Sequence, residues 1–159
     1  MPETLPQSEI RAGLLKYAVF CLNRRPYFRE TLRQKLVLRT QKMKYGNQPE
    51  VISKILDDLQ KSGYLNDAYL AGAYVRRHLE KGYGPRIISF KLSRLHLDKD
   101  TIEIALSEEA DTDRQFASIQ KYAANHHKLD KRKLVSKLYL RGFSSLAINR
   151  LFDSEYIEE

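Results

Sequence analysis

The chain has 159 residues, and its 28 lysines and arginines outnumber its 20 aspartates and glutamates, which gives a formal net charge of +8. This basic balance favours a polyanionic partner, namely nucleic acid, an anionic membrane or an acidic protein surface. The single cysteine excludes an internal disulfide, and no apolar run approaches the ~18 residues of a membrane span. The N-terminal residues lack a signal-peptide pattern, so we expect a cytoplasmic protein without membrane contact.

Apolar residues recur at three- and four-residue spacing almost throughout, which predicts helices and no strands. After a loose tail over residues 1–7, we expect nine short helices, because glycine and proline fall between the periodic segments. The first three helices are expected at about 8–23, between Pro26 and Arg39, and at 49–62. The fourth would run from Asn66 or Asp67 to Glu80, and the fifth would start at Pro85. The last four would be capped by Asp98, by Asp111 or Thr112, by Asp130 and by Ser144.

One pattern occurs three times, an apolar residue followed by Lys-Leu three and four positions later. The i,i+4 apolar pairs Leu32/Leu36, Ile88/Leu92 and Leu134/Leu138 would face a core, with Lys35, Lys91 and Lys137 at its edge. Apolar pairs precede the pattern at Ala18/Leu22, Leu70/Tyr74 and, in part, Phe116/Gln120, and follow it at Ile52/Ile55/Leu56, Ile102/Ala105/Leu106 and Ile148/Leu151/Phe152. The sequence therefore predicts an all-α fold of three tandem three-helix repeats that form an elongated, curved array, over 8–65, 66–109 and 110–159, with a C-terminal tail at the end of the third.

The first repeat is longer than the others because it contains a polar, basic stretch over 39–48. We expect this stretch to be an exposed, mobile loop. Cys21 lies in an apolar run, which predicts a buried structural thiol.

No catalytic or metal-binding pattern is present in the sequence. The histidines lack the spacing of a zinc site, and we expect His78, His96, His126 and His127 to lie at the surface or at the edge of the core. The Gly-rich segment 82–85 lacks the ending of a nucleotide-binding loop. It is either a plain turn before a helix that starts at Pro85, or a phosphate contact flanked by Lys81 and Arg86.

Cations cluster on the predicted helices of the second and third repeats. No helix is marked as a base reader, so sequence-independent contact with phosphates or an acidic surface is expected. The candidate binding residues are Arg76, Arg77, Lys81, Tyr83, Arg86, Lys91, Lys131, Arg132, Lys133, Lys137 and Arg141. Tyrosines interleaved with these cations could stack on bases, but most are expected to be structural.

The central part of the chain resembles the signature of the RecX family. The resemblance is carried by Gly63-Tyr64-Leu65-Asn66-Asp67, Tyr69-Leu70-Ala71, Tyr74-Val75-Arg76 and Lys81-Gly82-Tyr83-Gly84-Pro85, followed by Ile88 and Leu92. It extends loosely from about residue 10 to 152. The chain departs from the family in having Lys91-Leu92 instead of Glu-Leu. It also has Arg94-Leu95-His96-Leu97 instead of a Lys-Gly-Ile-type turn, so the residue at which the fifth helix ends is not defined by the family pattern.

The resemblance implies a non-enzymatic regulator of the bacterial recombinase RecA in DNA repair and recombination. Such a protein would bind in the groove of the RecA filament on single-stranded DNA and restrain filament growth, ATP hydrolysis and strand exchange, with DNA contacts of its own to single strands and to duplexes. We expect a monomer without a cofactor. An alternative is a free-standing DNA-binding protein that competes with RecA for DNA, whereas a hydrolase or nuclease has no supporting carboxylate or metal constellation.

Overall fold

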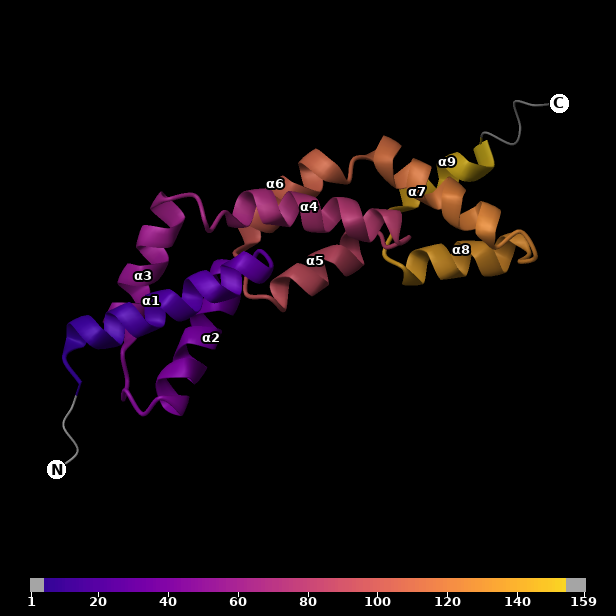
Figure 1. Cartoon of the computed structure of the whole chain (residues 1–159). Coiled ribbons are helices and arrows are strands. Elements are labelled where there is room, and N and C mark those ends of the chain that lie inside the picture. Colours follow the sequence, from indigo (N-terminus) through magenta and orange to yellow (C-terminus); the bar gives the residue numbers. More distant parts are fainter. Residues whose placement is uncertain (1–4, 154–159) are drawn as a thin grey trace. The chain divides into compact units, whose positions relative to one another are not determined.

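The computed structural model describes residues 5–153, and α-helices joined by turns and short loops make up this range (Figure 1). The nine helices of the described residues are α1 (Gln7–Arg24), α2 (Arg29–Lys42), α3 (Pro49–Lys61), α4 (Asp67–Glu80), α5 (Pro85–Ser93), α6 (Lys99–Glu109), α7 (Thr112–Asn125), α8 (Lys131–Leu140) and α9 (Ser145–Asp153). The predicted all-α fold with three-helix repeats is confirmed. The predicted tail is described only from residue 5, and α1 begins inside it at Gln7.

The starts of α4, α6, α7 and α8 lie where the sequence predicts, because short polar side chains cap these helices. The side chains of Asp98, Asp111 and Asp130 each accept a hydrogen bond of 2.8 Å from a backbone N–H in the first turn of α6, α7 and α8. Asn66 accepts one from Tyr69 N at 3.1 Å at the start of α4. These side chains satisfy N–H groups that have no partner inside the helix, which is why helices begin where they do.

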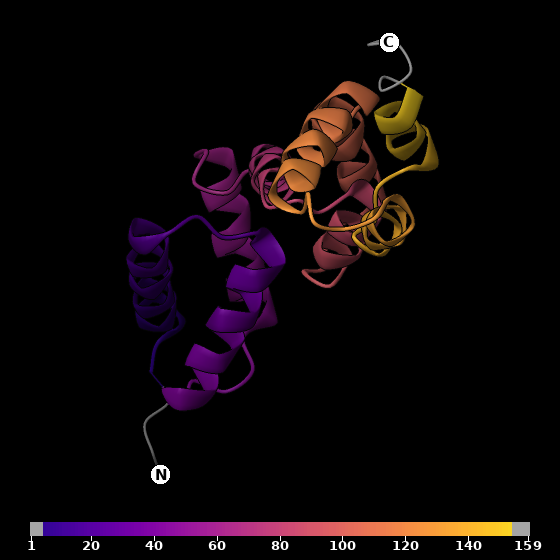
Figure 2. The ribbon, with the colours of Figure 1, turned by 90° about the vertical axis from the view of Figure 1, so that its right-hand side faces the viewer.

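The chain divides into two compact units, residues 1–70 and 71–159. The first unit contains α1, α2 and α3, which pack around a single apolar core (Figure 2). Leu32 and Leu36 are fully buried in this core, as their spacing predicts, and Cys21 is buried beside them. Its other buried members are Ile10, Leu14, Ala18, Ile52, Ile55, Leu56, Leu59 and Leu65.

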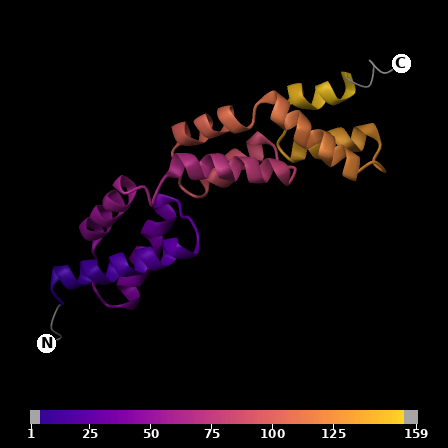
Figure 3. The same ribbon diagram turned by 45° about the horizontal axis from the view of Figure 1, so that its top comes forward.

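The second unit holds most of α4 and all of α5 to α9, and α7 packs against α9 within it (Figure 3). The pairs Ile88/Leu92 and Leu134/Leu138 are buried, as predicted. The register of the preceding helices differs from the prediction, because the buried positions lie one residue away. These buried positions are Ala71 and Val75 on α4, and Gln115 and Ile119 on α7.

The stretch 39–48 is more ordered than its polar composition predicts. Its first four residues continue α2, and Thr40 is buried with its hydroxyl donating to the Val37 carbonyl at 2.6 Å. Tyr45 packs against the core, and its hydroxyl oxygen would lie only 3.1 Å from a Cβ at Gly13. The expectation of an exposed loop is therefore wrong at these two positions, because each side chain finds an internal contact.

The turn after α5 contains His96 where the family pattern has a glycine-containing turn. Helix α5 ends at Ser93, and His96 adopts φ of 62°, the left-handed conformation that glycine takes at the ends of many helices. Histidine thus adopts a backbone conformation that residues other than glycine seldom take.

Candidate nucleic-acid and partner-binding surface

The Gly-rich turn 82–85 is a contact between the second and third repeats. Gly84 N–H donates to the Arg141 carbonyl at 2.7 Å, and Arg86 N–H donates to the Gly142 carbonyl at 3.1 Å. A Cβ at position 84 would lie 2.2 Å from Phe143 N, so only glycine permits this approach. The turn that precedes α5 therefore docks directly against the turn that precedes α9.

This docking removes the phosphate contact considered for the start of α5. Pro85 has no N–H, the N–H of Arg86 is already bonded, and a Cβ at Gly142 would lie 2.6 Å from Ile87 N. The helix N-terminus is covered by backbone rather than open to an anion. The structure therefore favours the plain-turn interpretation, because the N–H groups that a phosphate contact would need are bonded or covered.

Arg141 completes the contact between the two turns. Its Nη2 donates to the Lys81 carbonyl at 2.9 Å, and its Nε donates to the Gly82 carbonyl. Its guanidinium carbon also lies 4.4 Å from the centroid of the Tyr83 ring and 4.9 Å from that of Tyr122. The guanidinium thus binds the carbonyls after α4, which gives this predicted binding residue an internal structural role.

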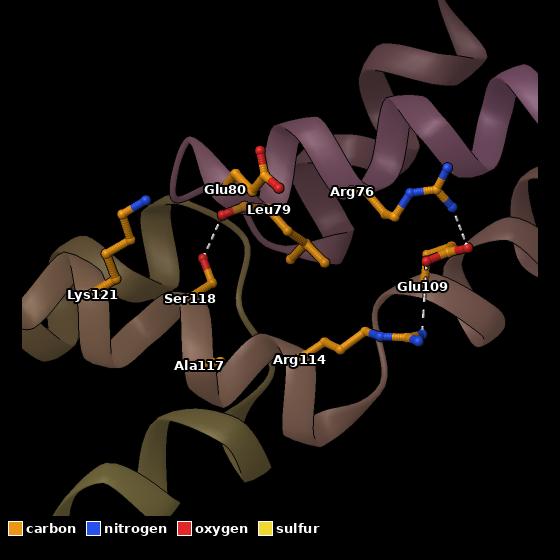
Figure 4. Close-up of a pocket in the computed structure, with 8 residues that line it drawn as sticks. All are labelled: Arg76, Leu79, Glu80, Glu109, Arg114, Ala117, Ser118 and Lys121. Atoms are coloured by element: carbon orange, nitrogen blue, oxygen red, sulfur yellow. Dashed lines mark hydrogen bonds and ion pairs between the residues drawn. The ribbon is translucent and has the colours of Figure 1, made fainter.

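Arg76, another predicted binding residue, lines a cavity of about 300 Å³ within the second unit (Figure 4). Its Nη1 lies 2.5 Å from Glu109 Oε1, and Arg114 approaches the other carboxylate oxygen at 3.7 Å. Ser118 on α7 donates its hydroxyl to the Leu79 carbonyl at 2.5 Å across the same cavity. Arg76 therefore neutralises a carboxylate of its own unit, which reduces its availability to an external anion.

Lys91 occupies a position that the first repeat duplicates. Its Nζ lies 5.1 Å from the centroid of Tyr83, and Lys35 lies 5.6 Å from Tyr27. Each lysine follows its tyrosine by eight residues. In the third repeat Leu129 stands eight residues before Lys137, and Lys137 is exposed. Two of the three lysines expected at equivalent edges thus rest on an aromatic ring.

The remaining predicted cations differ in how much their charge is engaged. Arg86 donates to the Tyr139 carbonyl at 2.6 Å, Lys131 lies 4.3 Å from the Phe152 centroid, and Lys133 lies 3.8 Å from Asp130. Four exposed cations of the predicted set have side chains without a hydrogen-bonding, ionic or aromatic partner among residues 5–153: Arg77, Lys81, Arg132 and Lys137. These four are the members of the predicted set whose charge is fully available.

The histidines occupy two related settings. The ring of His78 stacks on Tyr74 at 3.9 Å between centroids, and His126 stacks on Tyr122 at 4.0 Å. Burial lowers the pKa of His78, and the nearby Lys81, Lys91 and Arg77 lower it further, against a raising hydrogen bond to the Tyr74 carbonyl. Across residues 5–153 no group of three His, Cys, Asp or Glu side chains could hold a metal ion.

The predicted set misses the first repeat, where Tyr17, Phe20, Arg24 and Arg39 form a row of rings and cations. The signal is present in the sequence, since Tyr17, Phe20 and Arg24 follow the i, i+3, i+7 spacing of one helix face. Charge density alone does not reveal it, because the row combines few cations with several rings.

Comparison with known proteins decides the family. A family model described as the second three-helix domain of RecX matches residues 66–106. Regulatory protein RecX of Pseudomonas fluorescens is 31% identical over 154 residues, which cover 89% of this chain and 91% of that protein. The chain belongs to the RecX family.

Other members differ in how much of their length the chain spans. Regulatory protein RecX of Photobacterium profundum is 30% identical over 142 residues, but these cover 50% of that protein. The crystal structure of RecX from Lactobacillus salivarius matches 92% of this chain and 97% of its own, with a TM-score of 0.77 and 21% identity. The arrangement of helices is therefore that of a RecX fold. In the part of the chain that the structure describes, no helix is long and apolar enough to cross a membrane.

Proposed function

We propose that this member of the RecX family is a non-enzymatic modulator, mainly a negative regulator, of the RecA recombinase. It binds in the groove of the RecA filament on single-stranded DNA and restrains filament growth, ATP hydrolysis and strand exchange. The observation that carries the proposal is the near full-length similarity to the Regulatory protein RecX of Pseudomonas fluorescens. The net charge of +8 suits a partner that is itself a nucleic-acid complex.

The predicted binding residues differ in whether their charges are engaged within the protein or are available to a partner. Arg141, Arg86 and Arg76 are engaged with groups of their own unit, so their loss would disturb the fold as well as any binding. Arg77 and Lys81 lie one turn apart on α4 and the turn that follows it, and both are exposed. We assign the filament contact in this region to Arg77 and Lys81.

The test is the rate of DNA-dependent ATP hydrolysis by RecA, measured while the protein is added up to stoichiometric amounts. The proposal predicts that the rate falls, and an unchanged rate at low and moderate salt would refute it. The double variant Arg77→Ala/Lys81→Ala should inhibit less than the wild type while keeping its helical circular dichroism. A charge-matched control, Lys54→Ala/Lys99→Ala, removes two exposed lysines outside the predicted set and should inhibit like the wild type.

A further inference from the structure

In the first repeat, α1 and α2 share a row of aromatic rings and arginines. The guanidinium carbon of Arg39 on α2 lies 4.7 Å from the centroid of Tyr17 on α1, and that of Arg24 lies 4.7 Å from the centroid of Phe20. Tyr17 and Phe20 stack with centroids 6.4 Å apart and planes inclined by 21°. These four residues, which we name the aromatic–cation row, therefore form one continuous series of planar groups.

A second group adjoins the row along the chain. Tyr27, in the connection between α1 and α2, has Arg25 at 4.7 Å and Lys35 at 5.6 Å from its centroid. Arg25 directly follows Arg24, and Lys35 lies one helical turn before Arg39 on the same face of α2. Four cations are thus gathered around three rings.

The charges of this surface are not neutralised within the first unit. Three carboxylates of α2 and α3 pair with other arginines, in Arg11–Asp58, Arg29–Asp57 and Arg33–Glu30, at 2.7, 2.7 and 2.6 Å. Among residues 5–70 no ion pair holds Arg24, Arg25, Lys35 or Arg39. Their charge is available to an external anion.

The exposure of Phe20 indicates that the surface does more than stabilise the fold. Phe20 is 52% exposed, whereas Leu14, Ala18 and Cys21 form the buried face of the same helix. Four cation–ring contacts lie on α1, α2 and their connection. An exposed apolar ring beside unpaired cations can stack on a base while the cations pair with phosphates.

We propose that the aromatic–cation row is a binding site for single-stranded nucleic acid, with bases stacking on Phe20 and on the guanidinium planes and with phosphates paired to Arg24 and Arg39. The inference rests on the proposed function, in which the chain works on a filament of single-stranded DNA, and adds the surface that contacts the strand. Every base offers a π-face, so stacking of this kind is tolerant of sequence.

A single strand fits the surface better than a duplex or an acidic protein. Bases inside a duplex are already stacked on one another, so a duplex would engage the four cations but leave Phe20 exposed. An acidic protein surface would likewise use the charges without requiring an aromatic ring. The arginine planes add stacking to their ionic contacts, which a carboxylate partner alone would not need.

The experiment measures the affinity of the full chain for a fluorescently labelled oligothymidylate and for a labelled duplex, by fluorescence anisotropy without RecA. Phe20→Ala should weaken binding of the single strand by about fivefold or more, the lower limit for removal of a base–aromatic stack. It should leave duplex binding nearly unchanged. Arg24→Gln/Arg39→Gln should weaken both and reduce the slope of log affinity against log salt by about 0.7 for each phosphate of the single strand that is no longer neutralised.

The chain offers a matched control in Phe90→Ala, because Phe90 is 59% exposed and has Arg94 four residues later at 5.8 Å from its centroid. That ring belongs to no row, so the control should bind the single strand like the wild type. Equal weakening by Phe20→Ala and Phe90→Ala would overturn the inference, as would unchanged affinity of Phe20→Ala. If Phe20→Ala no longer inhibits RecA but still binds the single strand like the wild type, the inference is also overturned. The surface would then be assigned to an acidic protein partner. A chain that binds the single strand through Phe20 but has no effect on RecA would refute the proposed function alone.

Discussion

Replacing Gly84 by alanine tests the docking of the second repeat onto the third. Gly84 has φ of −89° and ψ of 172°, a backbone conformation that alanine adopts without strain. The only obstacle is steric, since the new Cβ would lie 2.2 Å from Phe143 N and 2.3 Å from Gly142 C. One of the two turns must therefore move.

The cost follows from the bonds that this movement breaks. The backbone bonds from Gly84 to Arg141 and from Arg86 to Gly142 would be lost, and the two bonds from the Arg141 guanidinium would be weakened. At about 0.5–1.5 kcal/mol for each hydrogen bond, the variant should lose roughly 2–4 kcal/mol of unfolding free energy. This is a large part of the roughly 5–15 kcal/mol that stabilises a typical domain.

The assay is urea unfolding followed by far-ultraviolet circular dichroism, with Gly72→Ala as the control. Gly72 lies inside α4, where a Cβ would meet its nearest neighbours at 3.6 and 3.7 Å, which is ordinary contact. Because glycine is a poor helix former, Gly72→Ala should gain about 0.5–1 kcal/mol. If Gly84→Ala unfolds at the same urea concentration as the wild type, the two turns do not pack as described.

Three further predictions concern single side chains. His96→Gly should raise the unfolding free energy by about 1 kcal/mol, because it relieves the left-handed conformation, and a lower urea midpoint would contradict this. Leu138→Ala should lower it by about 2–5 kcal/mol, whereas Leu140→Ala, at a position 75% exposed, should change it by less than about 0.5 kcal/mol. Because the pKa of His78 is lowered in the folded protein, the unfolded chain binds a proton at this histidine at a higher pH than the folded protein does. The neutral His78 therefore contributes fully to the free energy of unfolding above pH 6.5, and this contribution declines as the pH falls below that value. Urea midpoints at several pH values should therefore decline less on acidification in His78→Phe than in the wild type, and equal declines would refute this assignment.

Local features of the fold could be predicted from the sequence, because they depend on neighbouring residues. Asp98, Asp111 and Asp130 cap their helices as expected, and the Leu32/Leu36 stripe is buried. The predicted register of α4 is wrong because Ala71 carries a weaker hydrophobic signal than its neighbour Leu70 and is the residue that faces the core.

The role of Arg141 could not be predicted, since it depends on carbonyls about sixty residues earlier that only the fold brings near. In the sequence this arginine is indistinguishable from a surface cation. Conversely, Arg39 is absent from the predicted set because its contact with Tyr17 forms only when α1 packs on α2. The sequence thus shows where the cations are, whereas the packing of the helices determines which of them can bind an external anion.

Regulation of the filament and competition for DNA are distinguished by RecA-catalysed ATP hydrolysis on single-stranded DNA, measured with the protein present at a salt concentration where its binding to bare DNA is no longer detectable. Regulation of the filament itself predicts that inhibition persists under these conditions and survives an excess of bare competitor DNA. If inhibition disappears together with bare-DNA binding, the protein acts only by competing for DNA and does not regulate the RecA filament.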